Sequence, residues 1–219
     1  MKKENNNSEQ ESSGLPFEYH EKEFWDFFYK NRNPEVNNIN WYFDITKINI
    51  ENFSLNNLSK EDEILLVGAG LSSILDYFND NDYEKITIFD FSEELVKILN
   101  DKYNKDWAID CYDILELNDS FASDFNIIID KGCLDCILTD KQHGQENFIK
   151  AFSNLMLLLN DEGTLYYFST AKDRDNLFNQ GVKVKFKVTK IDMNKDMATE
   201  YSQFKHEDNI YYLYTIQKS

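Results

Sequence analysis

The sequence predicts an α/β fold in which a mostly parallel sheet is covered by helices and ends in a C-terminal antiparallel hairpin. From residue 63 onward, short apolar runs alternate with helical patterns, which is typical of parallel strands joined by crossover helices. The run 125–130 is almost entirely apolar, as expected of a strand buried on both faces. Near the C-terminus, apolar and polar residues instead alternate over 182–193, and a second strand-like run follows at 209–217. This pattern favours an antiparallel pair of strands.

The individual elements follow from local patterns. Pro16 can open a helix through residue 31, in which Phe24, Trp25, Phe28 and Tyr29 form a broad apolar face. A loop, the segment 40–45 and a second, weaker helical stretch to about Leu58 are expected next. Ser92 is the expected N-cap of a later helix. We expect strands at 63–67, 85–90, 106–111, 125–130 and 163–170, and helices at 71–78, 92–100 and 145–159.

Length and charge limit the classes of function. The 219 residues, of 26.0 kDa, suit one domain. The formal net charge of −17 argues against a nucleic-acid partner, because binding a phosphate backbone requires a basic surface. An acidic surface serves solubility or a basic macromolecular partner. No run approaches the roughly 18 apolar residues of a membrane span, and a monomer is favoured.

The first residues and the cysteines indicate a cytoplasmic protein. Residues 1–15 read as a disordered polar tail without the features of a signal or transit peptide. Cys111, Cys133 and Cys136 are too few for a disulfide scaffold, and the three widely separated histidines predict no metal site. Cys133 and Cys136 have the spacing of a redox centre or half a zinc site, but we interpret them as small apolar residues near a pocket.

Two glycines predict a nucleoside site. Gly68 and Gly70 follow the strand 63–67 and precede a helix, in a chain with only 7 glycines. Glycine permits a tight turn and lets a ligand approach the main chain closely. Asp90 ends the next expected strand, where a carboxylate can accept hydrogen bonds from ribose hydroxyls. The alternative is a tight turn with an incidental aspartate.

Position 73 separates two kinds of nucleoside. A dinucleotide fingerprint requires glycine or alanine there, and this chain has Ser73. The strand-like run 209–217 is also foreign to most dehydrogenases. Both features favour S-adenosylmethionine, which has no pyrophosphate, as the cofactor, with S-adenosylhomocysteine as its product.

The chain resembles the seven-strand S-adenosylmethionine-dependent methyltransferases. The resemblance covers about residues 18–170 and rests on EFWDFFY, NWYFD, LLVGAGLS, TIFDFS and IIIDKGCLDCIL. It is specifically to the group that includes the elongation factor 1-alpha lysine methyltransferases and the citrate synthase lysine methyltransferase. Cys133 stands where that group commonly has threonine. The resemblance implies a Rossmann-like sandwich and a protein-lysine acceptor, with a translation elongation factor as an example.

The resemblance also implies a set of cofactor contacts. The ribose is assigned to Asp90, and the adenine edge to Asp113 and Ile114, with Asp110 as a competing residue. Trp25, Tyr29 and Trp41 match aromatic residues that close over the cofactor; the alternative for Trp25 and Tyr29 is a purely structural role in the core. The complete predicted cofactor-binding set is Trp25, Tyr29, Trp41, Gly68, Gly70, Asp90, Phe91, Asp113, Ile114 and Lys131.

The chemistry of methyl transfer requires mainly positioning and desolvation. Aromatic faces attract the sulfonium cation of the donor, and burial lowers the pKa of an acceptor amine so that it can lose its proton. Asp130, Lys131 and Asp135 are the predicted catalytic residues: either carboxylate can orient the amine, and Lys131 lines the pocket. The alternative for each carboxylate is a helix-capping role.

The predicted function is a methyltransferase that acts on a protein lysine. A small-molecule methyltransferase, a nicotinamide-dependent oxidoreductase and a non-catalytic interaction module remain open. We expect a single domain over 16–219 that follows the tail 1–15. Its predicted parts are a helical lid (16–60), a cofactor-binding core (61–170) and C-terminal strands (171–219).

Overall fold

The computed structural model describes residues 17–31, 38–50, 52–103, 105–116, 125–182, 185–193 and 211–218. Its main feature is a seven-stranded sheet in the order β5-β4-β3-β6-β7-β9-β8. The pairs from β5 to β7 are parallel, whereas β9 is antiparallel to both β7 and β8. The strands are β3 (Ile64–Val67), β4 (Ile86–Asp90), β5 (Ala108–Cys111), β6 (Phe125–Lys131), β7 (Leu159–Ser169), β8 (Phe186–Asp192) and β9 (Tyr212–Lys218).

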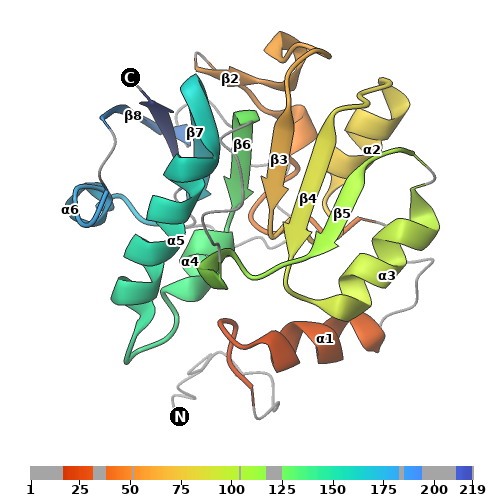
Figure 1. The fold of residues 1–219 in the computed structure, drawn as a ribbon, viewed down its shortest axis with the longest axis horizontal. Coiled ribbons are helices and arrows are strands. Elements are labelled where there is room, and N and C mark those ends of the chain that lie inside the picture. Colours follow the sequence, from red (N-terminus) through yellow and green to blue (C-terminus); the bar gives the residue numbers. More distant parts are fainter. Residues whose placement is uncertain are drawn as a thin grey trace, which may run out of the picture.

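Helices cover both faces of the sheet (Figure 1). On one face, α2, α3 and the segment 39–55 contribute to one apolar cluster, and on the other face α5 and α6 contribute to a second. Successive residues of β3 belong to alternate clusters, as a strand buried on both faces requires. The helices are α1 (Lys22–Lys30), α2 (Ser73–Asp80), α3 (Glu93–Lys102), α4 (Cys133–Ile137), α5 (Gly144–Leu158) and α6 (Asp175–Phe178).

The α/β architecture predicted from the sequence is confirmed, including the antiparallel C-terminal pair. The predicted cap is also present, because Ser92 Oγ accepts a hydrogen bond from Leu95 N at 3.3 Å. The helix α1 lies beyond the carboxyl ends of β3 and β4 (Figure 1). It is fastened to the start of α3, where Asp26 Oδ1 accepts from Ser92 Oγ at 2.7 Å and Lys22 pairs with Glu93 at 3.1 Å.

The second helical stretch predicted to end near Leu58 is wrong. The chain there forms a short hairpin of β1 (Asn49–Ile50) and β2 (Phe53–Ser54), between 3₁₀ turns at Ile45–Lys47 and Leu55–Asn57. This segment is rich in asparagine and isoleucine, which have lower helix propensities than straight-chain residues. Its apolar side chains reach the core from the hairpin instead.

Two short helices were not expected from the sequence, α4 directly after β6 and α6 after β7. Each is too brief to show a helical period. The tail predicted over 1–15 lies outside the described residues. Among the described residues, no helix is long and apolar enough to cross a membrane, and no cluster of three metal-ligating side chains occurs.

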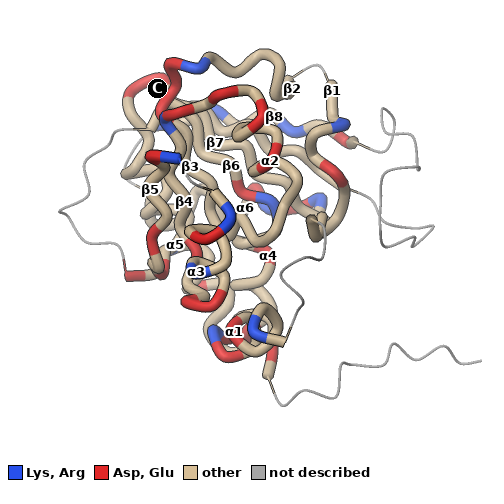
Figure 2. Tube along the Cα trace, turned by 90° about the vertical axis from the view of Figure 1, so that its right-hand side faces the viewer, with Lys and Arg blue, Asp and Glu red and all other residues tan. Residues whose placement is uncertain are grey.

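Charged residues are distributed over many elements (Figure 2). Several of them form exposed ion pairs, such as Lys85–Glu61 at 3.1 Å and Lys105–Asp82 at 3.2 Å. Pairs of this kind contribute little to stability. The excess of Asp and Glu in the whole chain, 40 against 23 Lys and Arg, therefore acts mainly through the field around the protein.

Candidate active site

A cavity opens at the carboxyl ends of β3, β4, β5 and β6. It contains about 910 Å³ of empty space, including its open mouth. β4 lies on one side of β3 and β6 on the other, so the strand order reverses here. Ligands of open α/β sheets bind at such a switch point. The lining includes all ten predicted cofactor-binding residues, and also Tyr19, His20, Tyr42, Val67, Phe89, Tyr112, Leu115, Gly132, Cys133, Cys136 and Ile137.

The turn after β3 requires its two glycines. Gly68 and Gly70 have φ angles of +55° and +57°, a backbone conformation that residues other than glycine rarely adopt. A Cβ atom at Gly68 would lie only 2.7 Å from the Cβ of Cys133 in α4. The turn therefore approaches α4 more closely than any side chain allows, and it leaves backbone at the cavity wall.

Ser73 has an internal role at the start of α2. Its Oγ lies 2.5 Å from Asp44 Oδ1 and 2.9 Å from Asn40 Oδ1, and its backbone N donates to Asn40 Oδ1 at 3.1 Å. These bonds fasten α2 to the segment 38–44. The position that a dinucleotide fingerprint gives to glycine or alanine therefore carries a side chain with fixed partners.

Asp90 is a buried acceptor at the end of β4. It is 7% exposed and lines the cavity. Its Oδ1 accepts from Ser92 N at 3.1 Å, and burial raises the pKa of Asp90 to about 6, against the opposing effect of backbone hydrogen bonds from Ser92 and Gly70. A carboxylate has about four lone-pair positions. Two of them are available for hydroxyl groups of a ligand.

We expect the affinity for S-adenosylhomocysteine to fall on acidification. Above the pKa of Asp90, about 6, the carboxylate accepts hydrogen bonds; below it, the bound proton turns one oxygen into a donor. Calorimetric titrations between about pH 5 and pH 8 measure this dependence. Asp90→Asn, which does not ionise, should bind weakly and equally over that range. An affinity of the parent protein that does not change with pH would contradict this assignment.

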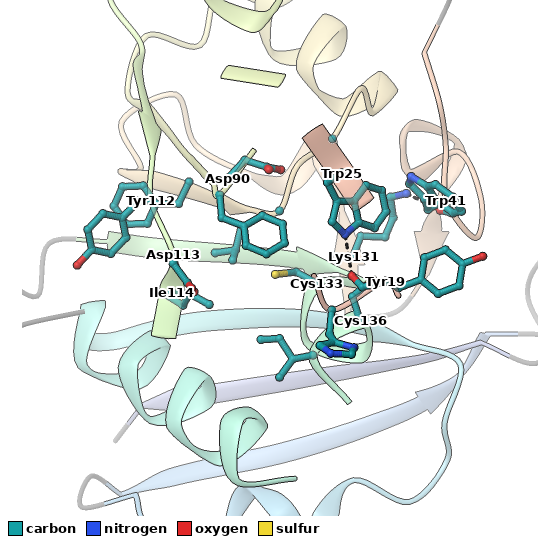
Figure 3. Close-up of a pocket in the computed structure, with 18 of the residues that line it drawn as sticks. Tyr19, Trp25, Trp41, Asp90, Tyr112, Asp113, Ile114, Lys131, Cys133 and Cys136 are labelled. Carbon is teal, nitrogen blue, oxygen red and sulfur yellow. Dashed lines mark hydrogen bonds between the residues drawn. The ribbon is translucent and has the colours of Figure 1, made fainter. Parts of the chain in front are cut away.

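The ends of β4 and β5 form one side of the cavity (Figure 3). Phe91 follows Asp90, and Tyr112, Asp113 and Ile114 follow β5. Asp113 Oδ1 accepts from Leu115 N at 2.8 Å, so its second oxygen can meet a ligand. Asp110 is an exposed residue of β5 and does not line the cavity. Of the two competing aspartates, the structure places Asp113 at the cavity.

Aromatic side chains from α1 and from residue 41 close the other side (Figure 3). The Trp25 ring stacks on Tyr29 at 5.9 Å and meets Trp41 edge-on at 5.5 Å. Trp25 Nε1 donates to Tyr19 O at 2.7 Å. These residues are both buried in the core and in contact with the cavity. The two interpretations of Trp25 and Tyr29, core and cofactor wall, are therefore compatible.

Replacing Trp25 with leucine separates the two roles. Loss of packing alone should lower the free energy of unfolding by about 3 kcal/mol and leave ligand affinity in the folded protein unchanged. A ring that faces the sulfonium adds a second effect, because S-adenosylmethionine is cationic and S-adenosylhomocysteine is neutral at sulfur. We expect the variant to lose more affinity for the former, measured by calorimetry. Equal losses for the two ligands would restrict Trp25 to a packing role.

Lys131 ends β6 beneath the segment 41–43. Its Nζ donates to Trp41 O and lies 5.8 Å from the centre of the Phe43 ring. Burial lowers the pKa of Lys131 to about 7, although Asp44 and Asp130 oppose that effect. The ammonium is thus close to losing its proton at neutral pH. An anionic group of a ligand in the cavity would stabilise its charged form.

The other two predicted catalytic residues are not brought to the cavity. Asp130 is fully buried and accepts from Gly132 N and Leu134 N at 3.0 Å each, at the start of α4. Asp135 accepts from Tyr42, Tyr167, Ser169, Thr170 N and Arg174. Both carboxylates are occupied by protein donors, so neither orients an acceptor in the cavity. Asp130 has the capping role that the sequence left open, whereas Asp135 holds Tyr42 in the cavity wall.

Several lining residues were not predicted. Tyr19, His20 and Tyr42 lie in loops beside predicted residues, and Tyr112 follows β5 directly. Tyr112 directly follows the end of a strand, and that position is a signal that would have identified it. Cys133 and Cys136 line the cavity as free thiols. Burial raises the pKa of Cys136 to about 12, consistent with the interpretation as apolar residues near a pocket.

Comparisons with known proteins connect this geometry to solved structures. No protein-family model matches the sequence, and no curated protein matches it. A structure from a study of the conversion of a disulfide bond into a thioacetal group during echinomycin biosynthesis is similar over 90% of this chain and 93% of that chain, with 13% identity and a TM-score of 0.58.

Two further structures are S-adenosylmethionine-dependent methyltransferases. The TehB-like enzyme from Corynebacterium glutamicum matches 74% of this chain and 83% of its own, with 14% identity and a TM-score of 0.54. A methyltransferase from Methanosarcina mazei matches 74% and 95%, with 13% identity and a TM-score of 0.51. The seven-stranded sheet, with its antiparallel C-terminal pair, is therefore the Rossmann-like fold of S-adenosylmethionine-dependent methyltransferases.

Proposed function

We propose that this protein is an S-adenosylmethionine-dependent methyltransferase. The observation that carries the proposal is the gathering of one glycine turn, one buried ribose acceptor and one aromatic wall around a single cavity, at the switch point of the sheet. A nicotinamide-dependent oxidoreductase is disfavoured because the side chain of Ser73 is fixed by Asn40 and Asp44. A non-catalytic module has no need for a cavity with these three features together.

The residues of the cavity suit the parts of this cofactor. Asp90 accepts from the ribose hydroxyls, while Phe91, Asp113 and Ile114 receive the adenine. The turn at Gly68, where a Cβ would meet Cys133, leaves room for the amino-acid part. When bound, the cofactor supplies an electrophilic methyl group on a sulfonium, and the rings of Trp25, Tyr29 and Trp41 stabilise that cation and exclude water.

The proposed acceptor is a lysine side chain of a protein. Its ammonium must lose a proton before it can attack, and apolar aromatic walls lower the pKa of an amine that enters them. The net charge of −17 attracts a basic acceptor surface, and the sequence resemblance to lysine methyltransferases points in the same direction. The helix α1, within the predicted lid 16–60, contributes Trp25 and Tyr29 to the wall of this site.

Transfer of a labelled methyl group identifies the acceptor class. The protein is incubated with S-adenosylmethionine carrying a labelled methyl group and cell lysate, and with purified translation elongation factor 1-alpha as the first defined acceptor. Asp90→Ala is the control for cofactor-dependent transfer. Label on lysines of a protein supports the proposal. Label confined to the small-molecule fraction would contradict the lysine acceptor and show that a methyltransferase of this kind acts on a small molecule.

A further inference from the structure

We propose that His20 is the catalytic base that receives the proton of the methyl acceptor. The inference rests on the proposed methyltransferase function. The proton leaves the nucleophilic atom of the acceptor for Nε2 of His20, and the electron pair of the broken bond stays on that atom, which becomes able to attack. A neutral imidazole thereby becomes an imidazolium.

His20 is held in a fixed turn before α1. It lines the cavity beside Tyr19 and near Cys136 of α4. Glu21 N donates to Glu18 O at 3.0 Å, and Glu18 N donates to Glu21 Oε2 at 2.8 Å. Trp25 Nε1 fastens Tyr19 O to the aromatic wall. The imidazole is therefore placed by the same helix that closes the cavity.

Thr139 favours one tautomer of the His20 ring. Thr139 Oγ1 donates its single proton to Cys136 O at 2.7 Å. The same oxygen lies 3.4 Å from His20 Nδ1, so it can serve Nδ1 only as an acceptor. This contact favours the neutral tautomer with the hydrogen on Nδ1, which leaves the lone pair on Nε2. This is the tautomer that a base requires at Nε2.

Two acidic residues lie near His20. Glu18 Oε2 lies 3.7 Å from Nδ1, on the same turn. Asp140, which follows α4, also interacts with His20 electrostatically. The carboxylates that line the cavity, Asp90 and Asp113, belong to the ribose and adenine side; Asp113 and Tyr19 lie on opposite sides of the cavity (Figure 3). Among the described lining residues, His20 and Lys131 are the side chains with a basic nitrogen, and Nζ of Lys131 already donates to Trp41 O.

The tautomer and the position of the ring can be measured by NMR of the intact protein. The chain has only three histidines, and His20→Gln assigns the signals. We expect the Nδ1–H tautomer at His20, and a mixture of tautomers in Thr139→Val. S-adenosylmethionine should change the His20 ring signals more than S-adenosylhomocysteine does, because only the former carries the sulfonium charge. His143, whose side chain is 63% exposed, serves as the control.

The labelled-methyl assay gives the catalytic readout. His20→Gln should transfer label to the lysate at least about 100-fold more slowly than the parent protein, whereas His143→Gln should transfer it at the parent rate. An Nε2–H tautomer, equal changes of the His20 ring signals with the two ligands, or an unchanged rate in His20→Gln would each overturn the proposal. If neither ligand changes the amide signals of Gly68 and Gly70, the proposed function fails instead, so the two failures are distinct.

Discussion

Replacing Asp90 with alanine is expected to abolish most of the cofactor affinity while the protein remains folded. In the proposed complex the carboxylate accepts from both ribose hydroxyls, and a hydrogen bond to a charged group contributes about 1.5–3 kcal/mol. Loss of even one such bond weakens binding by about tenfold or more. Calorimetric titration with S-adenosylhomocysteine measures the affinity, and thermal unfolding checks that the fold is intact.

A matched control is available on the neighbouring strand. Asp110 pairs in register with Phe89, directly beside Asp90, but its side chain is exposed outside the cavity. Asp110→Ala removes the same charge without removing a ligand contact, so its affinity should stay within about twofold of the parent value. Equal losses in the two variants would mean that only the general field of the protein matters, and Asp90 would then have no specific role.

Gly68→Ala is expected to destabilise the protein by about 2–5 kcal/mol, the sum of a left-handed backbone strain and a steric clash. The added Cβ would lie 2.7 Å from Cys133 Cβ and 2.9 Å from Cys133 Sγ, so β3 and α4 must separate. Because both elements line the cavity, the same displacement should remove ligand binding. Urea unfolding measures the loss of stability.

Gly70→Ala separates the clash from the strain. Gly70 has nearly the same φ, +57°, but the nearest atom to its added Cβ is Tyr29 Oη at 3.1 Å. We expect this variant to lose only the backbone contribution, about 1–2 kcal/mol. If both variants were equally stable, close contact with Cys133 would not be the reason for glycine at position 68.

The parts of the fold that the sequence predicted are those with a strong local period. The apolar run of β6 and the helical spacing of α2, α3 and α5 determine their elements almost independently of context. The hairpin of β1 and β2 was missed because its stability comes from packing against the core rather than from local preference. Helix α4 has five residues, which is too few for a period, and its N-cap is Gly132, whose φ is +95°.

The site divides in the same way. Gly68, Gly70 and Asp90 were identified because their chemistry is tied to fixed positions at strand ends. Asp135 was misplaced because its partners, Tyr167 and Arg174, come from a distant part of the chain that no sequence pattern links to it. His20 was missed for the same reason. Its significance depends on Thr139, 119 residues away, and only the folded chain brings the two together.

Calorimetric titration of the full chain with S-adenosylhomocysteine and, separately, with NAD tests the central claim most directly. The buried acceptor Asp90 and the glycine turn accommodate a nucleoside, whereas Ser73, fixed by Asn40 and Asp44, replaces the small residue of a dinucleotide fingerprint. We therefore expect saturable binding of S-adenosylhomocysteine and no binding of NAD. Binding of NAD with no response to S-adenosylhomocysteine would contradict the assignment of this cavity to a methyltransferase.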